Sequence, residues 1–479
     1  MESAQKPSLD LLALSDEPDG HFPVAKDSDL GPFSKDSFFK SVQWQVQPHA
    51  NTRNVSSRSL TPNRSADGTT LLTSSYGNRI CSYVLPENLL EPKQEPALLR
   101  AQGTLIQAAA SNAFAPCPYW ALENPATQAV LVSSTDHPIQ LHYAFPPPSE
   151  SGERAGSLPV QPPPIASFHL IKRETEAYLP IASLIWPAPG THFVAGTTNR
   201  LAVFDVSRSD AMKSEPLLSI PTIPSTRHIS KGNGIGMRGT VAALSAQVRG
   251  HGDLGLVAAG TWTRNMGLYD LQRSGECVAT WNVSTAATEA GIGGGGVVQT
   301  VWSPCGRYLV VNERGASGLL VYDLRGTNQL LAHLNGRQSN RNQRLSCDVY
   351  PGTDAIGGFE VWTGDRNGAV LVWEGVGNEA GGVPPSWDWQ AHECPIGGAA
   401  MHMSGSVLAT CSGAWKDADD STNSGSSGTD SDDSGDNSDS EDSTSEPIST
   451  HEYTPFVVRE TTLKVWSIKS PGPNSEAGP

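Results

Sequence analysis

Residues 297–373 decide the fold of this chain, and they run VVQTVWSPCGRYLVVNERGASGLLVYDLRGTNQLLAHLNGRQSNRNQRLSCDVYPGTDAIGGFEVWTGDRNGAVLVW. Alternating apolar residues in VVQTVW predict a half-buried strand, and SPCG at 303–306 is typical of a turn. YLVV, LLVYD and QLLAHL predict three further strands, after which the pattern restarts with RLSCDVYP, EVW and AVLVW. Four short strands that restart after about 40–50 residues are the sequence signature of a β-propeller blade.

The remainder of the chain fits the same unit, and seven such units are predicted. Their third strands each carry an aromatic residue, at intervals of about 50–65 residues apart from a longer last interval that contains a low-complexity insertion. One blade cannot bury both faces of its twisted sheet, so neighbouring blades must stack in a ring. We therefore predict an all-β, seven-bladed β-propeller with these aromatic residues as wedges between blades: Tyr83, Tyr143, Phe204, Tyr269, Tyr322, Trp373 and Trp466.

The two ends of the chain are polar and have little periodicity, which predicts that they are mostly disordered. No outer strand is visible in the last blade after Ile468, where the sequence SPGPNSEAGP predicts a tail. We expect a strand from the N-terminal arm, between His21 and Phe33, to close this blade and cover its edge. The predicted organisation is an N-terminal arm over residues 1–33, the propeller over 34–470 with an acidic, Ser-rich insertion at 416–450, and a tail over 471–479.

Composition and charge suit this fold and leave the partner open. Among 479 residues, 37% are hydrophobic and 17% charged, with 47 Gly and 36 Pro, as expected of a turn-rich all-β core. The net charge is −16, but residues 417–446 hold eleven acidic residues and no basic one, so the rest of the chain sums to only −5. Net charge therefore does not exclude a nucleic-acid partner. The acidic tract also suits phosphorylation by an acidophilic kinase.

Motifs for catalysis, metals and membranes are absent from the sequence. The seven cysteines lack the spacing of a zinc or redox motif, which favours packing residues in a reducing compartment. No apolar stretch is long enough for a membrane span, and no signal peptide is predicted. None of the 12 histidines has HExxH spacing, and GIGGGG at 291–296 lacks the Lys of a phosphate-binding loop, which favours a flexible loop. We predict no catalytic site, no metal and no cofactor.

Arginines gather on one predicted face of the ring. The turns between second and third strands emerge on the same face as the connections to the next blade, and five of seven such turns carry arginine while blade 2 offers His137. Guanidinium groups suit phosphates, and amides suit base edges in single-stranded or looped RNA. The alternative is that these are ordinary turn arginines, paired with carboxylates such as Glu313 and Asp365. The candidate RNA contacts are Arg325, Arg337, Arg341, Asn342, Arg344 and Arg366, with Arg79, Arg200, Arg264 and Arg314 as a supporting ring.

The acidic insertion is predicted to lie in the second-to-third-strand connection of the last blade. It would therefore emerge on the arginine-bearing face. We expect it to compete with a polyanion for the arginines, more strongly at low salt than at high salt.

Several motifs together resemble the telomerase Cajal body WD40 protein family and its fungal relatives. They include FFKSVQW at 38–44, GLVAAGTWTRNMGLYDL at 255–271, and the series VYDLRGTNQLLAHL, RNQRLSCDVYP and GDRNGAVLVW within residues 321–373. Most repeats depart from this pattern, since they lack the Gly-His and Trp-Asp pairs of consensus WD40 units, and the N-terminal region is short. The resemblance implies a WD40-type propeller that binds small Cajal body RNA and, in animals, telomerase RNA. In fungal relatives it implies spliceosomal small nuclear RNPs and pre-mRNA splicing.

These observations favour a non-catalytic nuclear scaffold for a small non-coding RNA or RNP, with a further pool in the cytoplasm. The expected partners are that RNA, its RNP proteins and telomerase, with chaperonin assistance in folding; we expect a monomer and no membrane contact. The alternative of a different class is a protein–protein interaction hub that binds a peptide or protein on the same face without touching RNA. A propeller hydrolase is a more distant third hypothesis, because no catalytic set is visible.

Overall fold

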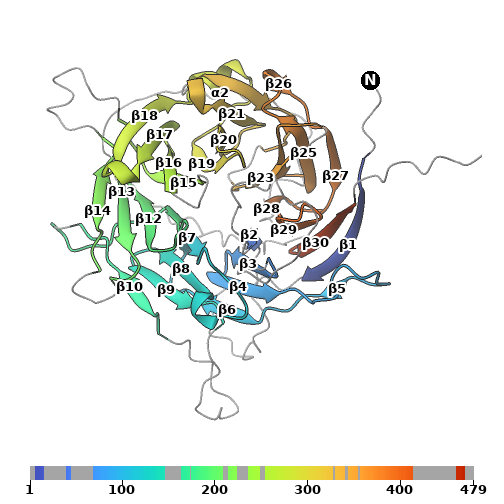
Figure 1. The fold of residues 1–479 in the computed structure, drawn as a ribbon, viewed down its shortest axis with the longest axis horizontal. Coiled ribbons are helices and arrows are strands. Elements are labelled where there is room, and N and C mark those ends of the chain that lie inside the picture. The colour runs from blue at the N-terminus through green and yellow to red at the C-terminus, as the bar shows by residue number, and fades with distance from the viewer. Residues whose placement is uncertain are drawn as a thin grey trace, which may run out of the picture.

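The chain forms a ring of seven blades around a central axis (Figure 1). The computed structural model describes residues 6–15, 39–44, 68–145, 163–172, 174–208, 214–223, 236–248, 254–326, 329–339, 343–353, 356–413 and 460–469. Their strands make seven separate sheets, so the predicted all-β, seven-bladed propeller is confirmed. The boundaries predicted for the N-terminal arm and the C-terminal tail lie outside the described residues.

Each blade has an inner strand nearest the axis and three strands that follow outward as antiparallel neighbours. The blades are: blade 1, β2 (Phe39–Trp44), β3 (Thr70–Ser75), β4 (Arg79–Val84) and β6 (Gly103–Ile106); blade 2, β7 (Ser111–Pro116), β8 (Ala129–Ser134), β9 (Ile139–Tyr143) and β10 (Ala166–Phe168); blade 3, β11 (Ser183–Ile185), β12 (His192–Thr197), β13 (Arg200–Asp205) and β14 (Leu218–Pro221); blade 4, β15 (Val241–Val248), β16 (Leu254–Thr261), β17 (Asn265–Asp270) and β18 (Glu276–Asn282); blade 5, β19 (Val297–Trp302), β20 (Tyr308–Glu313), β21 (Leu319–Asp323) and β22 (Leu330–Leu334); blade 6, β23 (Cys347–Pro351), β24 (Phe359–Gly364), β25 (Ala369–Val376) and β27 (Trp387–Gln390); and blade 7, β28 (Ile396–Met401), β29 (Val407–Ser412), β30 (Leu463–Lys469) and β1 (Ser8–Ser15). Two short strands, β5 (Ala97–Leu98) and β26 (Gly381–Val383), extend the sheets of blades 7 and 5, and the helical segments are α2 (Ser284–Glu289), η2 (Pro125–Thr127), η4 (Leu271–Arg273) and η5 (Leu324–Gly326).

Blade 7 is closed by the N-terminal part of the chain. β1 pairs antiparallel with β30 in a ladder that runs from Ser8 opposite Lys469 to Ser15 opposite Leu463, and Figure 1 shows β1 beside β30 at the rim. This ladder covers the edge that β30 would otherwise expose. The predicted donation of an N-terminal strand is therefore confirmed, but its predicted position between His21 and Phe33 is wrong.

The core is divided into seven clusters of buried side chains, one at each junction between neighbouring blades. Alternate residues of one strand serve two clusters, because successive side chains point to opposite faces of a sheet. Leu71 packs toward blade 7 and Leu72 toward blade 2, while Val361 packs toward blade 5 and Trp362 toward blade 7. A strand buried on both faces has a continuous apolar run, which explains segments such as YLVV.

The aromatic residues of the third strands confirm most of the predicted wedges. Those of blades 1, 3, 4, 5 and 6 are at most 1% exposed and lie in the inter-blade clusters. Trp466 is half-buried, and Tyr143 is 39% exposed. Tyr143 is therefore not a wedge, because it is the last residue of β9 and extends beyond the packed part of the blade.

A buried polar network links the connection before blade 7 to the second and third strands of that blade. The Nε2 atom of His392 lies 2.7 Å from Thr410 Oγ1, which also accepts a hydrogen bond from Trp466 Nε1 at 2.9 Å. The Nδ1 atom of His392 lies 2.9 Å from Thr462 Oγ1 and 3.3 Å from Glu460 Oε1. Burial lowers the pKa of His392. Burial alone would raise the pKa of Glu460, but hydrogen bonds, led by the one with His392, hold it below its usual range. The network joins both sides of the connection whose residues 414–459 lie outside the description.

Candidate functional site

Most of the arginines predicted from sequence share one face of the ring. Because neighbouring strands are antiparallel, the turns between second and third strands lie on the same face as the connections to the next blade. We call this surface the b–c face. Among the turn arginines Arg200 is exposed, and four are half-buried: Arg79, Arg264, Arg314 and Arg366. Of the connection before blade 6, Arg337 and Arg344 are described, while Arg341 and Asn342 lie outside the described residues.

Arg325 lies on the opposite face. It follows β21 in η5, within the connection to the fourth strand of blade 5. Its guanidinium group pairs with both carboxylate oxygens of Asp323, and this pairing holds the pKa of Asp323 below its usual range. Arg325 therefore cannot act together with the b–c face, and it leaves the candidate set.

Arg337 is buried inside blade 5 and is only 1% exposed. Its Nη1 donates to Asn312 Oδ1 at 3.0 Å, and its Nε and Nη2 donate to the carbonyl of Ala316 at 3.3 and 3.0 Å. Burial lowers its pKa to about 10, so the group stays cationic at neutral pH. Its hydrogen bonds stabilise the turn after β20, and no surface is left for a phosphate. The expected role of Arg337 as an RNA contact is therefore corrected to a structural one.

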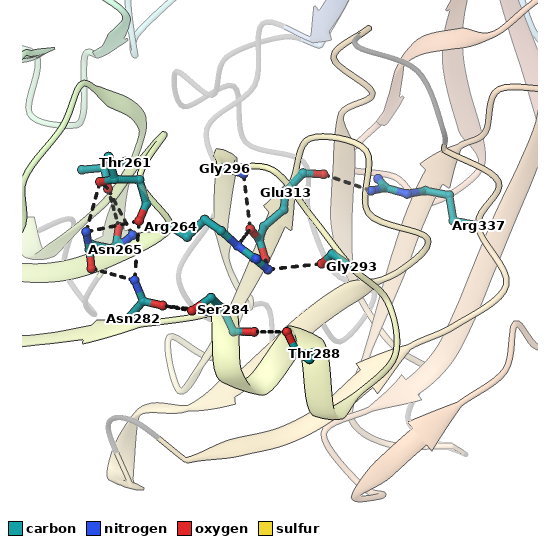
Figure 2. A network of polar contacts seen from close by, with 11 residues as sticks. Thr261, Arg264, Asn265, Asn282, Ser284, Thr288, Gly293, Gly296, Glu313 and Arg337 are labelled. Atoms are coloured by element: carbon teal, nitrogen blue, oxygen red, sulfur yellow. Dashed lines mark hydrogen bonds and ion pairs between the residues drawn. The ribbon is translucent and has the colours of Figure 1, made fainter. Parts of the chain in front are cut away.

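Arg264 is held by a carboxylate that the sequence did not assign to it. Its Nε and Nη2 donate to the two carboxylate oxygens of Glu313 at 2.7 and 3.1 Å, and the Glu313 side chain is only 2% exposed (Figure 2). This pair crosses from blade 4 to blade 5. Glu313 is thus unavailable to Arg314, its neighbour in sequence. Arg264 contributes mainly to the junction between blades.

Two glycines of the segment 291–296, Gly294 and Gly296, are closely fitted to this pair. Gly296 N–H donates to Glu313 Oε2 at 3.4 Å. A Cβ on Gly294 would meet the Glu313 carboxylate at 2.8 Å, and one on Gly296 would meet the Trp262 carbonyl at 2.6 Å. Both glycines have φ near +128°, in a region that other residues rarely adopt (+129° and +127°). The loop predicted here is therefore constrained at Gly294 and Gly296, whereas a Cβ on Gly291 or Gly293 would meet nothing within 4 Å.

Three cations gather near the axis on the b–c face, and together with Tyr76 we call them the axial cluster: Lys40, Arg314 and Arg344. Lys40 lies on β2 and donates to the Ser111 carbonyl at 2.9 Å, and its Nζ lies 5.5 Å from the centre of the Tyr76 ring. Arg344 lies just before β23 and donates to the carbonyl of Val298. Four blades thus meet at this point.

The axial cluster carries positive charge without an ion pair. Burial, together with a smaller effect of repulsion by Arg344, lowers the pKa of Lys40 to about 8. Burial also lowers the pKa of Arg344; the Tyr76 phenol opposes this shift and Arg314 adds to it. In the described part of the chain, none of the three cations forms a salt bridge with a carboxylate. Like charges held together in this way are suited to an anionic ligand.

Sequence reasoning missed Lys40, Tyr76 and Trp262. Lys40 is a charged residue inside the strand FKSVQW, which was a usable signal. Trp262 is 50% exposed in the turn between β16 and β17, and Arg314 lies 5.9 Å from its ring centre. Tyr76 is 38% exposed in the corresponding turn of blade 1. Exposed aromatic residues beside cations are typical of sites for single-stranded nucleic acid.

The described residues offer neither a metal site nor a membrane-spanning helix. No group of three or more His, Cys, Asp or Glu side chains in the described ranges could hold a metal ion. No helix among the described residues has the length and apolar character needed to cross a membrane.

Comparisons with known proteins add a distant relative. No family model matches the chain. It is 23% identical over 252 residues to the guanine nucleotide-binding protein negative regulator 1 of Schizosaccharomyces pombe (strain 972 / ATCC 24843). The match covers 53% of this chain and 53% of the relative, so the chain spans about half the length of the curated relative it matches. The resemblance to the telomerase Cajal body family is not confirmed by this match. The seven sheets show the propeller architecture that WD40 and Kelch repeats also form.

Proposed function

We propose that this chain is a non-catalytic nuclear scaffold that binds a small RNA, or the RNA of a small RNP, on the b–c face. The observation that carries the proposal is the axial cluster. Lys40, Arg314 and Arg344 are brought together from three blades, and no carboxylate among the described residues neutralises them. Arg200 and Arg366 are placed to extend the contact outward along the same face.

Without a ligand, the repulsion among the cations of the axial cluster is not compensated. Burial, and to a smaller extent repulsion by Arg344, already lowers the pKa of Lys40 to about 8. A phosphate placed among the three cations would remove the repulsion and release counterions, which favours binding at low salt. Guanidinium groups also match phosphate geometry with paired hydrogen bonds. The carboxylates of an acidic protein segment are spaced less regularly than the phosphates of RNA. RNA is therefore the better match for the axial cluster.

Crosslinking in living cells, followed by purification of this chain and sequencing of the attached RNA, tests the proposal. We expect one or a few small nuclear RNAs to be enriched, and we expect enrichment to fall when Arg314 and Arg344 are both changed to Glu. The matched control is Arg325→Glu, an exposed arginine on the opposite face. Recovery of no enriched RNA, with proteins still retained after RNase treatment, would overturn the proposal.

A protein–protein hub is the second candidate, and the distant relative favours it. The relative's name describes a negative regulator of a guanine nucleotide-binding protein, and propellers commonly bind protein partners. On this hypothesis the b–c face would bind an acidic protein segment. Purification with and without RNase separates the two candidates, because a direct protein partner remains after the RNA is destroyed.

A further inference from the structure

Trp262 is displayed by a turn that is rigidly held. Half of the residue's surface is exposed (50%), and among the described residues its indole N–H has no hydrogen-bond partner. Its own backbone N–H donates to the Thr240 carbonyl at 3.1 Å. Single exposed apolar residues are common on protein surfaces. Trp262 differs from such residues because hydrogen bonds and close packing hold its turn in place.

Hydrogen bonds tie this turn to its neighbours on both sides, as Figure 2 shows. Thr261 Oγ1 accepts from Asn265 N–H at 3.1 Å and lies 2.9 Å from Thr263 Oγ1. Asn282, at the end of β18, donates from Nδ2 to Asn265 Oδ1 at 2.9 Å and accepts at Oδ1 from Ser284 N–H at 2.9 Å. The turn is therefore fixed to the start of α2.

Blade 5 holds the turn from the other side. Arg264, which ends the turn at φ +63°, is clamped by the buried Glu313. The Trp262 carbonyl lies so close to Gly296 that a Cβ there would approach to 2.6 Å. A side chain on a turn fixed from two blades loses little freedom on binding, which is the condition for a rigid contact surface.

We infer that Trp262 is a stacking platform for an unpaired base, with Arg314 as its phosphate contact, so the ligand of the b–c face contains a single-stranded segment. This inference rests on the proposed RNA-binding function and names the form of RNA that the site takes. The Arg314 guanidinium lies over one face of the Trp262 ring, 5.9 Å from its centre, so a base would stack on the other face. Arg314 also belongs to the axial cluster and links the platform to the other cations. Every base has a flat face, so stacking of this kind selects unpaired nucleotides without selecting sequence. A stacked base beside a contacted phosphate fits this pair of side chains.

The test separates the base from the phosphate. Binding of an oligouridylate of roughly ten nucleotides is compared with binding of an abasic oligonucleotide of equal length, which keeps the phosphates and lacks the bases. Both are measured with the full chain, with Trp262→Ala and with Trp262→Phe. The matched control is Tyr119→Ala, which removes an exposed aromatic residue (47%) from the connection between β7 and β8 on the opposite face. Melting temperatures confirm that each variant is folded.

We expect Trp262→Ala to weaken oligouridylate binding by roughly tenfold or more, because one base–aromatic stack is lost. The abasic strand should bind the wild type and this variant alike. Trp262→Phe should recover most of the loss, and Tyr119→Ala should have no effect. Equal affinity of the wild type and Trp262→Ala for oligouridylate would overturn the platform while leaving phosphate binding intact. If the wild type binds neither strand, the proposed RNA-binding function itself fails.

Discussion

At the scale of single residues, Glu313 holds the junction between blades 4 and 5. Its side chain is 2% exposed and is neutralised by Arg264. Replacing Arg264 by Ala leaves a buried carboxylate without its cation, which is expected to lower the free energy of unfolding by roughly 3 kcal/mol. The exposed Arg200 serves as the control, and Arg200→Ala should change stability by less than about 0.5 kcal/mol. Denaturant unfolding measures both; equal stabilities would contradict the role given to this ion pair.

The raised pKa of Glu360 predicts that the stability of the fold depends on pH. Its partial burial, with repulsion from Glu374, raises its pKa from 4.5 to about 7, although Trp362 Nε1 donates to it at 3.0 Å. Because the folded-state pKa lies above the unfolded value, the contribution of Glu360 is full below pH 4.5 and is lost as the pH rises through 7. Glu360→Gln keeps an acceptor for Trp362 and removes the charge. We expect this variant to melt higher than the wild type at about pH 8 and alike at about pH 5.

The exposed Glu393 supplies the control for this measurement. Glu393→Gln should shift the melting temperature equally at both pH values, because its side chain is hydrated in the folded chain. A Glu360→Gln curve parallel to that of the wild type across this pH range would show that the carboxylate is not strained by burial.

The residue-scale contacts were the part that sequence predicted least. Glu313 precedes Arg314 in the sequence, yet it pairs with Arg264 from another blade. Lys40 and Arg344 lie close enough to repel each other, although about 300 residues separate them in the chain. The stacking of the blades decides which arginine is paired with a carboxylate. A local sequence pattern does not predict this pairing. Arg337 was misassigned because its burial follows from contacts inside blade 5, with Asn312 and Ala316. Arg325 was misassigned although its position after the third strand already places it on the opposite face.

At the scale of elements, the pairing of β1 with β30 predicts that the N-terminal strand closes the ring. Removing residues 1–15 takes away the ladder with β30 and the buried Ala13, and exposes the edge of blade 7. We expect the melting temperature to fall by roughly 5 °C or more. Removing only residues 1–5 provides the control and should leave it unchanged, because the ladder begins at Ser8. Equal melting temperatures of the two truncated proteins would show that β1 does not close the ring.

Elements buried on both faces were predicted well, and elements at the rim less so. Strands such as β20 and β25 have long apolar runs because both of their faces pack against neighbouring blades. β1 is the outer strand of its blade and is only partly buried, so SLDLLALS gave a weak signal and the closing strand was predicted too late in the chain. The packing of Gly294 and Gly296 could not be recognised from sequence, because their constraint comes from Glu313 and Trp262.

At the scale of the whole molecule, charge distribution predicts an effect of the acidic insertion. Residues 417–446 carry eleven acidic residues, and the flanking Gly413 accepts a hydrogen bond from Gln343, next to Arg344. Removing 417–446 changes the net charge from −16 to −5. We expect RNA to bind more tightly to the shortened chain at low salt, and equally at high salt, where charges are screened. Equal affinity at low salt would contradict this expectation.

The ring architecture can be predicted from the repeated strand pattern, whereas the ligand of the ring cannot. Seven units with one strand pattern leave little choice of architecture, because each blade needs neighbours on both faces. A scaffold acts through surface positions that the repeat pattern leaves free to vary. The b–c face could be predicted from strand order alone, but the axial cluster required the distances between blades.

The salt dependence of RNA binding tests whether the axial cluster contacts the phosphates of RNA. The logarithm of the association constant for a short single-stranded RNA is measured against the logarithm of salt concentration for the wild type, Arg314→Glu, Arg344→Glu and the opposite-face control Arg325→Glu. Each lost phosphate contact should reduce the slope by about 0.7, so the first two variants should bind more weakly and with a flatter slope, while the control matches the wild type. If all four folded proteins give the same affinity and slope, the axial cluster does not bind the RNA backbone.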